Sequence, residues 1–173
     1  VWDPSGNLIH EDLTTGNEDD KDNGSSVQGV LITRHPLNPE VYHVFCTDDV
    51  ISTANEGLDY FTLDKSGAVL SGPTTIQAGW SFEGLSATLH DNGVDVWVMS
   101  QESDNGNYNA YLIDCNGLNL AQSNLSQDMG IDFRGTKSYT RGALEFSWDG
   151  NKLAQGHPAA WPVGMQEVSL FDF

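Results

Sequence analysis

Short runs of alternating apolar and polar residues recur along the chain. They are rich in β-branched and aromatic residues, and the clearest are residues 27–33, 41–47, 58–64, 94–100 and 109–114. A period of two with this composition predicts half-buried β-strands. Residues 118–127 set leucines among Asn, Ser and Gln, where alternation favours an edge strand over a helix. The pattern therefore predicts an all-β domain.

Tight-turn residues separate these runs. The turns combine Asp or Asn with Gly, at Asp3–Gly6, Asp64–Gly67, Asp91–Gly93, Asp114–Gly117 and Asp149–Asn151. Gly adopts positive φ freely, and Asp and Asn side chains hydrogen-bond to their own backbone. Each turn therefore predicts an antiparallel hairpin.

Superposing the runs reveals a repeat. The segment Gln28–Leu31, followed by His35, lies 55 positions before Glu83–Ser86, followed by His90. The third runs of the two units lie 50 positions apart. A period of about 40 to 50 residues with four strands is typical of a β-propeller blade, although a series of hairpins could also build a sandwich.

The chain is therefore expected to be a single partial β-propeller domain of four-stranded antiparallel blades over residues 1–173. Residues 25–76 and 83–123 would form two complete blades. Residues 1–9 would end a preceding blade, and residues 140–173 would form an incomplete one. Because the chain opens without Met and stops inside an expected strand, we expect it to be a fragment of a longer protein.

The same residues carry a family resemblance. The chain resembles the propeller region of large secreted Bacteroidetes surface proteins, which often carry C-terminal sorting domains associated with gliding motility and type IX secretion. The resembling segments are Ser25–Ile32, Pro36–Phe45, Gly57–Tyr60, Asn92–Val98, Tyr108–Leu112, Gly142–Ala154 and Val168–Phe173. The chain departs from this family at Trp148, where Pro is commoner, and in an acidic stretch at Asn17–Asn23. The sorting domain itself is not among these residues.

This resemblance implies a location outside the cell or at the cell surface, on the outer face of a Gram-negative outer membrane. It also implies secretion or motility components of the outer membrane as partners. Charge narrows the other partner classes, because 25 acidic and 7 basic residues give a net charge of -18. Such a surface repels nucleic acid and anionic membrane. Because no apolar stretch approaches the roughly 20 residues of a spanning helix, no direct membrane span is expected.

The motifs of common catalytic classes are absent from the sequence: there is no His-Glu-x-x-His, no Gly-x-Ser-x-Gly, no phosphate-binding Gly-rich loop and no paired Cys motif. His35 and His90 recur at equivalent positions, which predicts a structural role in a turn. His43 has no visible partner in the sequence. We therefore expect no catalytic residue and no bound organic cofactor.

One acidic stretch is a candidate calcium site. Residues 17–24 combine several carboxylates with Gly24, and calcium takes about 6 to 8 oxygen ligands. Asp19, Asp20 and Asp22 are the candidate ligands. Because Lys21 stands where a calcium loop places a carboxylate, a solvated charge run is the favoured interpretation.

Cysteine and tryptophan positions add two expectations. Cys46 and Cys115 would lie on different blades, which disfavours a disulfide. Four tryptophans could offer a flat face to a sugar. We expect the inter-blade core to hold Trp97 and Trp148, and the surface to expose Trp80 and Trp161.

These observations favour a non-catalytic interaction or display module that binds a protein or glycan through loops on a propeller face. Residues 11–24, 71–82 and 123–139 are the expected ligand-binding loops. One alternative is a carbohydrate-active propeller, a glycoside hydrolase or lyase whose catalytic carboxylates lie partly in missing blades. Another is a structural subunit or cargo of secretion or gliding machinery.

Overall fold

The computed structural model describes residues 28–47, 57–79, 81–102, 107–125, 142–157 and 167–173. These residues form strands and no helix. The strands are β1 (Val30–Arg34), β2 (Val41–Thr47), β3 (Leu58–Asp64), β4 (Val69–Gln77), β5 (Ser86–Leu89), β6 (Val96–Gln101), β7 (Tyr108–Asp114), β8 (Gly117–Leu125), β9 (Leu144–Phe146), β10 (Lys152–His157) and β11 (Glu167–Asp172). The all-β prediction is confirmed for this part of the chain, and β8 covers most of the expected edge strand.

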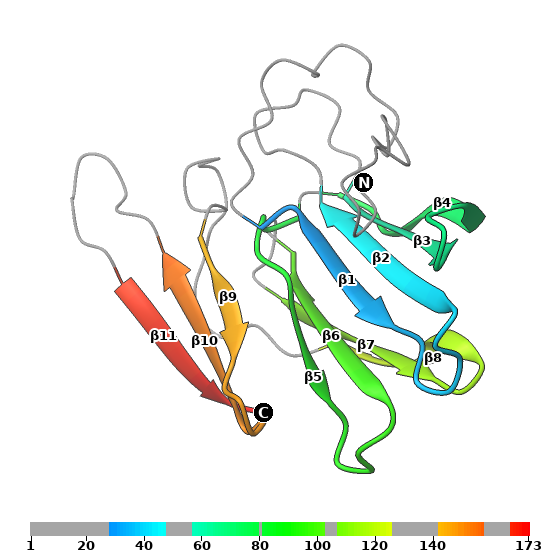
Figure 1. Ribbon diagram of the computed structural model, residues 1–173. Helices are drawn as coiled ribbons and strands as arrows, with labels where there is room; N and C mark the ends of the chain where they lie inside the picture. Colours follow the sequence, from blue (N-terminus) through cyan, green and yellow to red (C-terminus); the bar gives the residue numbers. More distant parts are fainter. Residues whose placement is uncertain (1–27, 48–56, 80, 103–106, 126–141, 158–166) are drawn as a thin grey trace.

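The strands form three antiparallel sheets, in each of which a strand pairs with the next one along the chain (Figure 1). Sheet 1 has the order β1-β2-β3-β4, and sheet 2 has the order β5-β6-β7-β8. Sheet 3 contains β9, β10 and β11 among the described residues. The predicted turns at residues 64–67, 91–93, 114–117 and 149–151 connect β3 to β4, β5 to β6, β7 to β8 and β9 to β10. The other four strand pairs carried no such turn signal in the sequence.

One expected loop is largely a strand. Residues 71–82 were expected to form a ligand-binding loop, but β4 continues through Gly72 and Pro73 to Gln77. This prediction is wrong because β4 is the outermost strand of sheet 1, where a proline removes no inner ladder hydrogen bond. Of the other two expected loops, residues 11–24 lie outside the described residues, and 123–139 begin as the end of β8 and then leave them.

The two repeated histidines stabilise the first turn of their sheets. Nδ1 of each ring accepts backbone N–H bonds from the turn that follows, at 3.2 Å for His35 and 3.1 Å for His90. Each ring also stacks on a ring of the next strand, His35 on His43 and His90 on Trp97. The predicted structural role of both histidines is confirmed.

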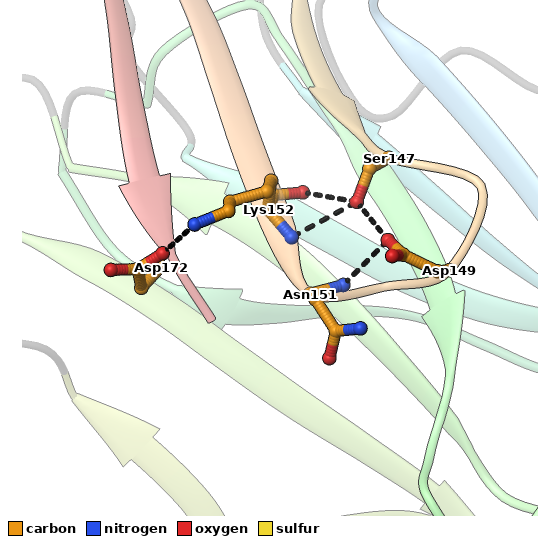
Figure 2. A network of polar contacts seen from close by, with 5 residues as sticks. All are labelled: Ser147, Asp149, Asn151, Lys152 and Asp172. Carbon is orange, nitrogen blue, oxygen red and sulfur yellow. Dashed lines mark hydrogen bonds and ion pairs between the residues drawn. The ribbon is translucent and has the colours of Figure 1, made fainter.

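Sheet 3 builds the corresponding turn with a serine, as Figure 2 shows. Ser147 Oγ donates to Asp149 Oδ1 at 2.6 Å and accepts the Lys152 N–H at 3.0 Å. Asp149 Oδ1 also accepts the Asn151 N–H at 3.2 Å, and these bonds hold the pKa of Asp149 below its usual value. Lys152 forms an ion pair with Asp172 on the neighbouring strand β11.

Two tryptophans expected in the core have different environments. Trp97 packs against the second hydrophobic core, as expected. Trp148 is 98% exposed, so its predicted burial is wrong. The reason is its position in the turn between β9 and β10, rather than on a strand. Trp80 and Trp161 lie outside the described residues.

The three sheets stack head to tail. We call the face of a sheet that meets the preceding sheet its front face, and the opposite side its back face. The first core joins the back face of sheet 1 to the front face of sheet 2, through Phe45, Leu58, Leu85, Val96, Val98, Tyr111 and Ile113. The second core joins sheets 2 and 3 in the same sense, through Phe82, Met99, Tyr108, Ala110, Leu144, Phe146 and Leu153. Both cores therefore have the same construction, one repeat apart.

Buried amide side chains lie at both junctions between the sheets. At the first junction, Gln77 Oε1 accepts hydrogen bonds from Ser100 Oγ at 2.8 Å, Asn109 Nδ2 at 2.7 Å and Tyr111 OH at 3.0 Å. At the second, Gln155 bonds to Tyr108 and Gln101. Buried polar groups need such partners, because losing one leaves a desolvated donor or acceptor.

Candidate binding pocket

A pocket of about 420 Å³ lies between sheets 1 and 2. Its walls come from the back face of sheet 1, from the turn before β2, and from the β7–β8 hairpin of sheet 2. The lining residues are His35, Val41, His43, Tyr60, Thr62, Ser71, Thr74, Ile76, Asn116, Gly117, Leu118 and Leu120. This volume falls within the range of small-molecule sites, roughly 300–1,000 Å³.

Three stacked rings contribute to one wall. His35 and His43 have ring centroids 5.3 Å apart, and His43 and Tyr60 have centroids 5.8 Å apart. His43 Nδ1 and Tyr60 OH share a hydrogen bond of 2.6 Å. The strands place these rings together because His43 on β2 pairs with Thr62 on β3, two residues beyond Tyr60 and therefore on the same face.

Hydroxyl groups extend this wall along β3 and β4. Thr62 Oγ1 and Ser71 Oγ lie 2.7 Å apart across the paired strands, and Thr74 also lines the pocket. The opposite side supplies Asn116 and the aliphatic Leu118. Among the described residues, no Asp, Glu, Lys or Arg contributes to the lining.

The pocket lies where sheet 1 departs from the repeat. His43 pairs with Thr33 as Trp97 pairs with Thr88, so the two residues occupy the same position in their sheets. By the same register, Tyr60 corresponds to Ala110 and Thr62 to Leu112. Sheet 1 thus places hydrogen-bonding side chains at three positions where sheet 2 has Trp, Ala and Leu.

At the junction between sheets 2 and 3, large aromatic rings surround the residue equivalent to His43. Trp97 meets Phe173 edge to face with centroids 6.4 Å apart, and Phe173 meets Phe146 at 4.8 Å. His43 is smaller than an indole, and no Phe ring of the described residues stacks on it. The substitution therefore accounts for the open volume at the first junction.

His43 is an uncharged imidazole at neutral pH. Its side chain is only 1% exposed, and burial, reinforced by the nearby His35, lowers its pKa to about 4. Its Nε2 is buried and has no hydrogen-bond partner among the described residues. Burial also raises the pKa of Tyr60 to about 12, so the hydrogen-bonded pair carries no charge at pH 7.

We expect acid to weaken the fold through His43. The unfolded residue takes up a proton near its ordinary pKa of 6.5, whereas the folded residue does so only near pH 4. The unfolded state therefore binds more protons between these values, and stability falls as the pH falls through this window. From pH 7 to pH 4.5, the wild type should lose roughly 2 kcal/mol more unfolding free energy than His43→Gln. Urea unfolding at both pH values measures this, and equal losses would contradict it.

The structure bears on some predicted site residues and not on others. Asp19, Asp20 and Asp22, the candidate calcium ligands, lie outside the described residues. Within the described ranges, no group of three or more His, Cys, Asp and Glu side chains could hold a metal ion. Cys46 and Cys115 are both free thiols, as their expected separation indicated. Burial, together with the neighbouring Asp59, raises the pKa of Cys46 to about 12.

Sequence reasoning assigned no role to His43, because its partner Tyr60 lies 17 positions away. A signal was present in the repeat, since the register of β2 and β6 sets His43 against Trp97. A residue that breaks an otherwise apolar repeat position is a candidate for function. Comparing the alternating segments by sequence alone does not show that His43 and Trp97 occupy the same position.

The described residues contain no helix long and apolar enough to cross a membrane. Comparisons with protein-family models, with curated proteins and with solved structures found no match for this chain.

Proposed function

We propose that the chain is part of a β-propeller, and that this propeller is a non-catalytic interaction module of an exported or cell-surface protein. The head-to-tail packing supports the propeller, because each sheet meets the next through opposite faces. The first strands also adjoin, since β5 contacts both β1 and β9. In addition, the Leu144 N–H of sheet 3 donates to Gln28 Oε1, just before β1, at 3.0 Å. Adjoining first strands are what a ring of radial blades requires.

The two outer faces of the stack support the same proposal. On the front face of sheet 1, Val30 is 61% and Ile32 is 51% exposed along β1, whereas Val44, Phe61 and Leu63 on the same face are buried. On the back face of sheet 3, Val168 is 73% and Leu170 is 67% exposed. The corresponding faces are covered at both internal junctions, so further sheets of the same kind would bury these side chains.

The observation that carries the binding role is the pocket, where hydrogen-bonding side chains replace the apolar residues of the repeat. Packed sheets form a rigid scaffold. A pocket whose residues differ from those at the equivalent positions of the next sheet is therefore a good candidate for a ligand-binding site. The net charge of -18 and the resemblance at Ser25–Phe45 support an extracellular or cell-surface setting, with secretion or gliding components as partners.

The test is binding without turnover. The purified protein is applied to a panel of glycans and surface proteins, and the supernatants are analysed for cleaved products. We expect a retained ligand and no product. His43→Trp introduces the residue that sheet 2 has at this position and adds bulk to the pocket wall, so it should abolish retention.

Leu89→Trp is the matched control, because it adds an indole at a side chain that is 63% exposed and outside the pocket. This variant should bind like the wild type. Product formed by the wild type would overturn the non-catalytic role and favour the carbohydrate-active enzyme. Retention by His43→Trp at the wild-type level would place the ligand elsewhere.

A further inference from the structure

We infer that the pocket between sheets 1 and 2 binds one ring of an uncharged sugar. This inference rests on the proposed binding role and specifies its ligand class. A pyranose ring has two unlike surfaces, a C–H face that packs on rings and aliphatic groups, and a rim of hydroxyl groups. The lining of the pocket has both kinds of surface.

The apolar contacts are suited to the face of such a ring. Tyr60 and His35 contribute ring surface from sheet 1, with the buried His43 ring stacked against both, and Leu118 with Leu120 contributes aliphatic surface from sheet 2. Leu120 is 53% exposed, so part of this surface is open to solvent. Apolar walls with a few placed polar groups are the usual composition of a small-molecule site.

The polar contacts are suited to the rim. Thr62 and Ser71 hydroxyls hydrogen-bond to each other at 2.7 Å, which leaves one donor and free lone pairs for a ligand, and Thr74 and Asn116 add a third hydroxyl and an amide. A hydroxyl group both donates and accepts, and the Asn side chain offers both functions. Such a set matches the mixed donors and acceptors of sugar hydroxyls better than it matches an ion.

The distribution of charged side chains favours an uncharged ligand. No Lys or Arg lines the pocket within the described part of the chain, and His43 is uncharged at pH 7, so a carboxylate, sulfate or phosphate would find no permanent counter-charge there. The net charge of -18 repels anions over the whole surface. Among the residues that the structure describes, no carboxylate lines the pocket to pair with a cation either. These conditions exclude sugar acids and nucleotides from the favoured class.

The test is ligand-observed NMR with the intact chain, followed by calorimetry. The probes are the methyl glycosides of glucose, galactose and mannose, with glucuronate as the charged comparison. We expect saturable binding of at least one neutral glycoside and at least tenfold weaker binding of glucuronate. Thr62→Val removes one hydroxyl at nearly constant shape and should weaken binding about fivefold. Thr88→Val makes the same change outside the pocket and should leave binding unchanged.

The outcomes separate this inference from the proposed function. If no neutral glycoside binds, but the panel ligand is still lost in His43→Trp, the binding role stands and the sugar assignment is overturned. Glucuronate binding as tightly as the neutral glycosides would also overturn it, as would equal effects of Thr62→Val and Thr88→Val. Thermal melting of each variant shows that it is folded, and Thr62→Val keeps the test decisive if His43→Trp does not fold.

Discussion

Alanine at Gly57 should destabilise the protein by roughly 3 to 5 kcal/mol, whereas alanine at Gly93 should cost about 1 kcal/mol. Both glycines have positive φ, +89° at Gly57 and +68° at Gly93, so both substitutions place an L-residue in a disfavoured backbone conformation. They differ in what the new methyl group meets. A Cβ at Gly57 would lie 1.9 Å from Gln77 O, and one at Gly93 would meet nothing within 4 Å.

The difference in unfolding free energy between the two variants reports how closely the backbone at Gly57 approaches the backbone at Gln77. Gly57 immediately precedes β3, and Leu58 pairs with Gln77 at the end of β4, so a methyl group at Gly57 must push the two strand ends apart. Backbone cannot yield as a flexible side chain can. Urea unfolding of both variants at pH 7 measures the two costs. Similar values for Gly57→Ala and Gly93→Ala would show that the strands do not approach in this way.

The contrast between these glycines also shows what sequence reasoning could predict. The Gly in Asp91-Asn92-Gly93 carries a local turn signal, and the hairpin between β5 and β6 follows from it. Gly57 carries no such signal, because its requirement comes from Gln77, twenty positions later. Local chemistry therefore predicts the hairpins, whereas contacts between distant segments determine where a glycine cannot be replaced.

The same limit applies to the pocket and to two wrong predictions. In the sequence, Trp148 belongs to an alternating segment that predicts a buried strand position. In the structure, the hydrogen bond between Ser147 and Asp149 closes a turn around it, and Trp148 is exposed. Gly72-Pro73 reads as a loop, yet an edge strand accommodates it. His43 gains its significance only beside Tyr60 and in place of Trp97. In each case, the deciding fact is the position of the residue within a sheet or between sheets.

Leucine at Gln77 should destabilise the protein by about 3 kcal/mol, because one side-chain oxygen satisfies three buried donors. Gln77 Oε1 accepts from Ser100, Asn109 and Tyr111, which are 0%, 2% and 5% exposed. Leucine has similar bulk and no acceptor, so the three donors lose this partner together. The cost lies at the low end of three unsatisfied donors at roughly 1 to 3 kcal/mol each, because leucine also removes Nε2, a buried donor with no partner among the described residues.

Ser100→Ala is the matched variant, because it removes one donor and leaves the oxygen with two partners. It should cost about 1 kcal/mol. Chemical unfolding monitored by far-UV circular dichroism gives both values. The bonds to Ser100, Asn109 and Tyr111 join β4 of sheet 1 to β6 and β7 of sheet 2, so Gln77→Leu should also weaken the junction that forms the pocket. If Gln77→Leu costs no more than Ser100→Ala, the apolar core of Phe45, Leu58 and Ile113 alone holds the two sheets together.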